Sequence, residues 1–225
     1  MKLNDLGLKY NTDKATECIV GDKKYVGHDY LRHYELFLKD FKQTEFEVVE
    51  LGCYTGASIN MWSEYFEKAE IIGVDLNSEL KSIETNKIKF ICSDATAEDL
   101  PAKIKDLAKY PIKLIIDDCS HAWGDQRRSF EMLFPMLNSG GYYIIEDLEC
   151  GSGGAYATSY PPKVWDSQLF FDYALDRMRI LRVSENRNPE RFRPFFDEMP
   201  KYIQDIERSI DMSIIIPGAI IFKKK

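Results

Sequence analysis

The chain has 225 residues, of which 44% are apolar and 30% charged, as expected for one soluble domain with a substantial core. Its formal net charge of −7 argues against a general nucleic-acid or anionic-membrane binder. The five cysteines are scattered without a CxxC pair, so we predict neither a disulfide framework nor a structural zinc site. No apolar run approaches the roughly 18 residues of a membrane span, and the first residues lack the apolar core of a signal peptide. We expect a cytoplasmic protein with no membrane partner, and the sequence leaves open a homo-oligomeric assembly.

Short apolar runs alternate with helical patterns through the middle of the chain. The predicted strands are Glu47–Leu51, Ile71–Val74, Lys89–Cys92, Lys113–Ile116 and Tyr142–Ile145, and helices are expected near Ala57–Glu67, Ala97–Lys109 and Gln126–Leu137. Because β-branched runs that alternate with helices are typical of buried parallel strands, we predict an α/β, Rossmann-like sheet with helices on both faces. The ending, DMSIII, Pro217-Gly218 and AIIF, predicts an antiparallel hairpin at the sheet edge.

Two segments lie outside this pattern within the one predicted domain. Residues 1–42 are expected to form a helical cap over one sheet edge, and residues 151–195 a lid or substrate insertion rich in turn formers at its start. Arg187, Arg191 and Arg193 form a local basic cluster. This cluster is either a solvated face or a contact for the phosphates of a nucleotide-linked sugar.

Acidic residues follow the predicted strands at the points where the strands end. In open α/β sheets, ligands bind in the crevice beyond the carboxyl ends of the strands. The residues at or near those ends are Glu50, Asp75, Asp94, Asp117, Asp118, Glu146 and Asp147. This coincidence places the predicted functional site at the carboxyl edge of the sheet.

The turn after the first predicted strand suggests a nucleoside cofactor. It reads Glu50-x-Gly52-x-x-x-Gly56, and its glycines would let the following helix approach a ligand closely. The third glycine of a dinucleotide fingerprint is missing, which disfavours a nicotinamide oxidoreductase. Asp75 is placed to accept hydrogen bonds from ribose hydroxyls and Asp94 to meet an adenine edge. An acidic residue instead of a phosphate cradle suits a cofactor with a cationic amino-acid portion.

A second group of polar residues has the chemistry of a divalent metal site. Hard cations such as Mg²⁺ prefer oxygen ligands, which Asp118, Glu146 and Asp147 would supply. A bound cation would lower the pKa of a coordinated hydroxyl, and His121, three residues beyond Asp118, would serve as the general base. The alternative is that the aspartates only cap turns or helices and that His121 is a surface residue. Cys119 is interpreted as a small filler, because no oxyanion partner for a nucleophile is visible.

From Phe46 to Asp147 the chain resembles the class I S-adenosylmethionine (SAM) methyltransferases. The motifs IDDCSH and GGYYIIED are similar to those of metal-dependent sugar O-methyltransferases that modify macrolide and other natural-product glycosides, and of the related cephalosporin-biosynthesis methyltransferase family. Further motifs that resemble this family are TDK at Thr12–Lys14, H-x-Y-x-x-x-Y-E at His28–Glu35 and S-x-x-M-W at Ser58–Trp62. The chain departs from the family where Cys119 and Ala57 replace glycines.

The resemblance implies the same ligands and base as the residues themselves: Asp118, Glu146 and Asp147 for Mg²⁺ or another divalent cation, and His121 for the proton. The residues assigned to SAM are Glu50, Gly52, Tyr54, Thr55, Ser58, Asp75, Asp94 and Asp117. The region after Asp147 matches the family poorly, so the identity of the acceptor stays open.

The expected reaction is metal-dependent transfer of a methyl group from SAM to a sugar hydroxyl. The acceptor would be a nucleotide sugar, a polysaccharide precursor or a natural-product glycoside. Substrate contacts are assigned to Lys14, His28, Tyr30 and Tyr156, although the first three also suit an ordinary amphipathic cap. The alternatives are catechol-type methylation, for which Trp123 is the local apolar candidate, and a non-catalytic SAM-binding scaffold.

Overall fold

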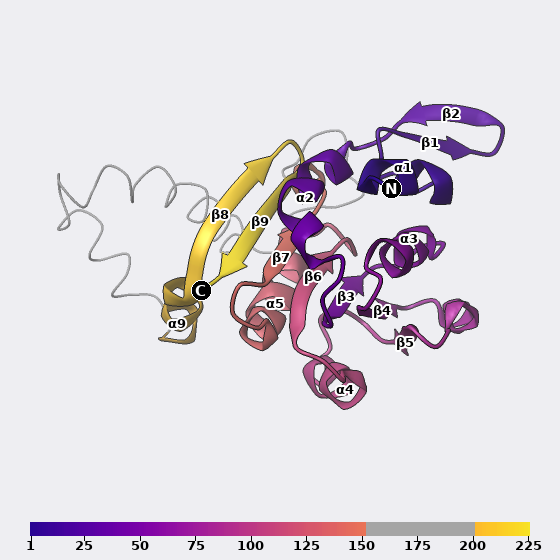
Figure 1. Ribbon diagram of the computed structural model, residues 1–225. Helices are drawn as coiled ribbons and strands as arrows, with labels where there is room; N and C mark the ends of the chain where they lie inside the picture. The colour runs from indigo at the N-terminus through magenta and orange to yellow at the C-terminus, as the bar shows by residue number, and fades with distance from the viewer. Residues whose placement is uncertain (152–200) are drawn as a thin grey trace, which may run out of the picture.

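A seven-stranded sheet forms the centre of the molecule. The structure, a computed structural model, describes residues 1–151 and 201–225. Its strand order is β5-β4-β3-β6-β7-β9-β8 (Figure 1). The parallel strands are β3 (Glu47–Leu51), β4 (Glu70–Asp75), β5 (Ile88–Cys92), β6 (Ile112–Asp117) and β7 (Tyr142–Ile145). The antiparallel strands are β9 (Ala219–Lys224), which pairs with β7, and β8 (Ile210–Ile216), at the edge. The predicted Rossmann-like sheet with its C-terminal hairpin is confirmed.

The strand order reverses between β3 and β6, and this reversal determines where a ligand fits. From β3 the chain moves outward through β4 to β5, and then returns to place β6 on the other side of β3. The connections that follow β3 and β6 therefore leave the sheet in opposite directions, which opens a crevice at the carboxyl ends of these strands.

Each face of the sheet is covered by its own layer of helices. Side chains alternate between the two faces of a strand, so Val48 belongs to one buried cluster and Val49 to the other. The first face is covered by α1 (Leu3–Tyr10), α2 (Tyr30–Leu38) and α3 (Ala57–Tyr65), and the second by α4 (Leu100–Leu107) and α5 (Trp123–Leu133). The described residues also form the 3₁₀ helices η1 (Lys39–Phe41), η2 (Ser78–Ile83) and η3 (Phe134–Met136) and the α-helices α6 (Leu148–Gly151) and α9 (Lys201–Ser209).

The N-terminal cap contains a β-hairpin as well as the predicted helices. Its strands, β1 (Glu17–Val20) and β2 (Lys23–Val26), form a separate antiparallel pair beside α1 (Figure 1). The strands are mostly exposed, so they lack the buried apolar pattern that marks the central strands. The missed signal was the two-residue Gly21-Asp22 loop between β-branched runs.

The predicted lid at residues 151–195 lies, except for its first residue, outside the described part of the chain, together with Tyr156 and the arginine cluster. Among the described residues, no helix is both long enough and apolar enough to cross a membrane.

We predict that the Phe222→Ala substitution in β9 lowers the free energy of unfolding by about 3–5 kcal/mol. Phe222 is buried, and its ring lies 4.8 Å from that of Phe130 in α5, so its removal leaves a cavity between sheet and helix. Urea unfolding measures the loss. Met212→Ala, at an exposed position of β8, is the control and should stay within about 0.5 kcal/mol of the parent. Equal losses of stability in the two variants would contradict the packing of β9 against α5.

Candidate active site

A cavity of about 890 Å³ lies at the carboxyl edge of the sheet, where most of the residues assigned from the sequence to the cofactor, the cation, the base or the substrate come together. Ten of them line it: Lys14, Gly52, Tyr54, Thr55, Ser58, Asp75, Asp94, Asp118, His121 and Asp147. Five others, Glu50, Asp117, Glu146, His28 and Tyr30, are absent from the lining. The cavity therefore contains most of the predicted cofactor contacts and two of the three predicted metal ligands.

The glycine turn after β3 lies directly against the loop after β6. Gly52 has a φ of +85°, and a Cβ atom there would lie 2.0 Å from the carbonyl oxygen of Asp118. The amide of Asp118 in turn donates to the carbonyl oxygen of Leu51 at 2.9 Å. Only glycine permits both this φ and this close approach. The predicted cofactor turn and the predicted metal loop are thus parts of one continuous surface.

Asp75 organises the glycine turn from the end of β4. Its Oδ2 accepts hydrogen bonds from the amides of Cys53 and Tyr54, at 2.8 and 3.1 Å, and its Oδ1 accepts one from Asn77 at 2.8 Å. An ionised carboxylate has about four acceptor positions, which leaves capacity for a ribose hydroxyl. Asp94, after β5, accepts from the amide and the hydroxyl of Thr96.

Glu50 and Asp117 lie behind the cavity wall. Both side chains are fully buried, and burial raises the pKa of each carboxyl to about 7, although Lys14 opposes the shift at Glu50. Asp117 accepts a hydrogen bond from the thiol of Cys119 at 3.1 Å. Burial, and then the charge of Asp117, raise the pKa of that thiol well above its ordinary value, so Cys119 stays protonated. The cofactor roles predicted for the two carboxylates remain predictions.

Asp118, His121 and Asp147 form a compact group of possible metal ligands. One donor atom from each lies within 4.8 Å of the other two, and His121 Nε2 is 3.7 Å from Asp147 Oδ2. His121 and Asp147 have φ angles of 54° and 55°. This left-handed backbone costs on the order of 1–3 kcal/mol per residue and is typical of functional sites. The carboxylates of Asp118 and Asp147 offer the oxygen ligands that a hard divalent cation prefers, so these two residues fit the predicted metal, and the imidazole of His121 lies beside them.

Glu146, the third predicted ligand, faces the N-terminal cap. Its Oε1 accepts a hydrogen bond from the hydroxyl of Tyr34 at 2.8 Å, and its Oε2 accepts one from the ammonium of Lys14. Burial raises the pKa of the Glu146 carboxyl well above its ordinary value, and the charge of Lys14 opposes this shift.

Lys14 is buried among carboxylates, where sequence reasoning had placed a substrate contact. Its side chain is 2% exposed, and its ammonium donates to Asp118 Oδ2 and Glu146 Oε2 and lies 3.5 Å from Glu50 Oε1. Burial lowers the pKa of Lys14, but the carboxylate charges outweigh that effect and hold the pKa well above its ordinary value. Lys14 is therefore charged. Apart from the TDK resemblance, no sequence signal indicates these contacts, because the partners are distant along the chain.

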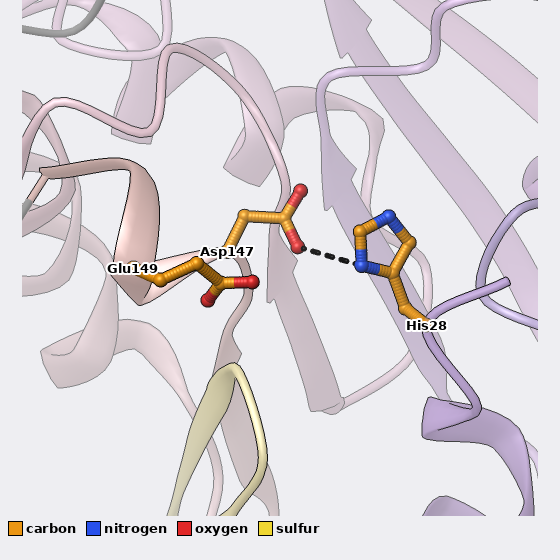
Figure 2. A group of neighbouring side chains, drawn as sticks. All are labelled: His28, Asp147 and Glu149. Atoms are coloured by element: carbon orange, nitrogen blue, oxygen red, sulfur yellow. Dashed lines mark ion pairs between the residues drawn. The ribbon is translucent and has the colours of Figure 1, made fainter. Parts of the chain in front are cut away.

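Asp147 lies between two histidines. Its Oδ1 is 3.5 Å from His28 Nδ1 and accepts a hydrogen bond from the hydroxyl of Tyr30 at 2.7 Å, whereas its Oδ2 faces His121. Figure 2 shows the ring of His28 directed at this carboxylate, with Glu149 of α6 alongside. His28 is partly exposed, whereas Tyr30 is buried, and neither side chain lines the cavity. Their predicted roles as substrate contacts remain predictions.

The FtsJ-like methyltransferase family matches residues 29–141, just over half of the chain. The chain belongs to this family.

Two curated relatives extend the similarity. Over 165 residues the chain is 32% identical to the 8-demethyl-8-alpha-L-rhamnosyl tetracenomycin-C 2'-O-methyltransferase of Streptomyces olivaceus, a match that covers 69% of this chain and 43% of the relative. Over 154 residues it is 30% identical to the L-olivosyl-oleandolide 3-O-methyltransferase of Streptomyces antibioticus, covering 64% and 36%. The match thus spans less than half the length of these relatives.

Among solved structures, the fold is similar to that of the MycE methyltransferase from the mycinamycin biosynthetic pathway, which was solved in complex with Mg and S-adenosylhomocysteine (SAH). The TM-score is 0.72 and the identity 23%, with coverage of 100% of this chain and 54% of MycE. This likeness establishes the shared fold.

We predict that Gly52→Ala destabilises the protein and weakens binding of SAH at least about tenfold. The methyl group would meet the Asp118 carbonyl at 2.0 Å and would impose a positive φ on alanine, so the turn must move away from the cavity. Urea unfolding and calorimetry measure the two effects. Gly140→Ala is the matched control, because its φ is +77° with open space around the added atom. It should cost about 1–2 kcal/mol and leave SAH binding unchanged. Similar SAH affinities in the two variants would contradict the close approach.

Proposed function

We propose that this protein transfers a methyl group from SAM to a hydroxyl of a sugar, with the help of a divalent cation. The observation that supports this most strongly is the grouping of Asp118, His121 and Asp147 in one cavity with the glycine turn and Asp75. The two curated relatives are named as O-methyltransferases of glycosides, and MycE was solved with Mg and SAH. Because the chain matches only part of each relative, the whole activity is proposed here.

The methyl donor would lie along the ends of β3, β4 and β5. The glycine turn there lets the donor approach the backbone closely, Asp75 offers acceptor capacity for a ribose hydroxyl, and Asp94 lies beyond it at the end of β5. A cavity of about 890 Å³ is within the usual range of ligand pockets, about 300–1,000 Å³. The side chains on this edge therefore suit a nucleoside ligand that lacks a pyrophosphate.

The proposed cation ligands are Asp118, Asp147 and Glu146. The first two line the cavity, whereas Glu146 is held by Tyr34 and Lys14. A bound Mg²⁺ would lower the pKa of the acceptor hydroxyl and orient it toward the methyl group.

His121 is the proposed general base. Its Nε2 faces Asp147 Oδ2 at 3.7 Å, so the ring lies on the same side of the cavity as the proposed ligands. His121 would take the hydroxyl proton while the acceptor oxygen bonds to the methyl carbon. The bond between that carbon and sulfur breaks, and its electron pair stays on sulfur. Asp147 would then stabilise the resulting imidazolium.

The catechol-type alternative loses its structural support at Trp123. The indole Nε1 of Trp123 donates to the carbonyl oxygen of Leu148 at 2.8 Å, and the side chain does not line the cavity. Among the described residues, Trp123 therefore does not offer the apolar clamp that a flat aromatic acceptor would need. A sugar, whose hydroxyls match acidic side chains, fits better.

We predict that EDTA stops methyl transfer to glycosides or nucleotide sugars and that excess Mg²⁺ restores it. The transfer is measured as the mass increase of the acceptor. The carboxylates alone would leave the acceptor hydroxyl with its ordinary, high pKa. Calorimetric titration with SAH in EDTA serves as the control and should still show binding, because Gly52 and Asp75, which are assigned to the cofactor, are not proposed as cation ligands. Full activity in the presence of EDTA would contradict the metal-dependent mechanism.

We predict that His121→Ala lowers kcat by about 10²–10⁴-fold, the usual contribution of a general base, with little change in SAH affinity. The pH–rate profile should also lose the limb that reports the base. His33→Gln on α2, outside the cavity lining, should leave kcat within about twofold. Full activity of the His121 variant would exclude this assignment.

A further inference from the structure

The ammonium of Lys14 lies where a cation is needed, between two proposed metal ligands. It donates to Asp118 Oδ2 and to Glu146 Oε2, and Glu50 lies 3.5 Å away on a third side. The side chains of Lys14, Glu50 and Glu146 are 2%, 0% and 1% exposed. We propose that Lys14 is a resident counter-ion of this carboxylate cluster, a positioning residue that competes with the divalent cation for Asp118 and Glu146.

The main chain on both sides of Lys14 is fixed by the segment that returns from the β1–β2 hairpin. The amide of Gly27 donates to the carbonyl oxygen of Thr16 at 3.0 Å, and that of Leu31 donates to the carbonyl oxygen of Lys14 at 3.2 Å. A Cβ atom at Gly27 would lie 2.0 Å from the carbonyl oxygen of Ala15. Lys14 is therefore built into the cap, and its ammonium reaches the cluster from a fixed point.

The carboxylates of the cluster favour a resident cation. Glu50, Asp118, Glu146 and Asp147 are four carboxylates at the ends of three adjacent strands, and Lys14 is the ammonium in contact with three of them. Buried carboxylates without a partner are strongly destabilising. Lys14 offsets part of this cost, so the protein can fold before it binds a metal.

The same contacts make Lys14 a competitor of the metal. An ammonium is a compact point charge that binds carboxylate oxygens without a required fork geometry, and here it uses the oxygens that a divalent cation would bind. A cation that enters must displace the ammonium or bind close to a like charge. Lys14 would thus weaken metal binding and keep it reversible.

Two tyrosine hydroxyls of the cap hold further oxygens of the proposed ligands. Tyr34 donates to Glu146 Oε1 at 2.8 Å, and Tyr30 donates to Asp147 Oδ1 at 2.7 Å. With Lys14, these hydroxyls contact all three proposed ligands from one segment of the chain. The cap therefore orients the ligands, and Lys14 adds the charge that neutral hydroxyls lack.

The test is Lys14→Met, which keeps an unbranched side chain of nearly the same length and removes its charge. We expect Mn²⁺ to bind the variant at least about tenfold more tightly than the parent. Electron paramagnetic resonance and calorimetry measure the two affinities. In EDTA the variant should unfold at a lower temperature than the parent, and Mn²⁺ should raise that temperature more in the variant. Unchanged or weaker Mn²⁺ affinity would overturn the proposal.

The matched control is Lys87→Met. The ammonium of Lys87 donates to the carbonyl oxygens of Ser63 and Phe66 at 2.6 and 2.8 Å, and Lys87 does not line the cavity. Its loss should destabilise the protein equally in EDTA and in Mn²⁺. A gain in Mn²⁺ affinity in this variant would count against a specific role for Lys14.

A second comparison covers the case in which Lys14→Met does not fold. It sets the double variant Lys14→Met/Glu50→Gln against Glu50→Gln, because the Glu50→Gln change removes one of the buried carboxylates that Lys14 neutralises. We expect the double variant to fold in EDTA and to bind Mn²⁺ about tenfold more tightly than Glu50→Gln alone. Equal affinities would overturn the proposal.

The inference rests on the proposed function only in that the carboxylates bind a divalent cation, and none of its measurements requires methyl transfer. Tighter Mn²⁺ binding without any methylated acceptor would sustain the role of Lys14 and contradict the reaction. Mn²⁺ binding by the parent that Lys14→Met leaves unchanged would overturn the role of Lys14 alone. No Mn²⁺ binding by either protein would contradict both.

Discussion

The ion cluster around Lys14 connects the N-terminal cap to the carboxylates at the ends of the strands. Glu50, Asp118 and Glu146 come from the ends of β3, β6 and β7, and a single ammonium from the N-terminal cap contacts all of them. Carboxylates buried so close together are stable only when a cation or a proton compensates their charge. Lys14 contributes this compensation to the carboxylates, while the apolar side chains of α1 and α2 pack the cap on the sheet.

A second constraint joins the proposed donor site and the proposed acceptor site. The close approach of Gly52 to the Asp118 carbonyl leaves no side chain between the cofactor turn and the metal loop. A donor along the turn and an acceptor at Asp118 would therefore share one cavity without a separating wall. Direct transfer between two bound molecules requires this proximity, and a glycine at this one position provides it.

The strands of the central sheet were predictable because their signal is local. Glu47–Leu51 and Tyr142–Ile145 were predicted with the boundaries that the structure has, since each is a short apolar run between turn formers. The predicted helix Gln126–Leu137 instead begins at Trp123 and ends at Leu133 before a 3₁₀ turn. Pro135 cannot donate a backbone hydrogen bond in that turn. The β1–β2 hairpin was missed, because its exposed strands have no buried face to produce a pattern.

By itself, the sequence determined the sheet, its carboxyl edge and the set of acidic residues at that edge, because strand periodicity and residue type are local properties. Only the tertiary structure decided how those residues divide. It directed Glu146 and Glu50 toward Lys14, left Asp118, His121 and Asp147 at the cavity, and placed His28 on the outer side of Asp147. The contacts of Lys14 with Asp118 and Glu146 join residues more than 100 positions apart. Their geometry depends on how the cap packs on the sheet, which no local pattern specifies.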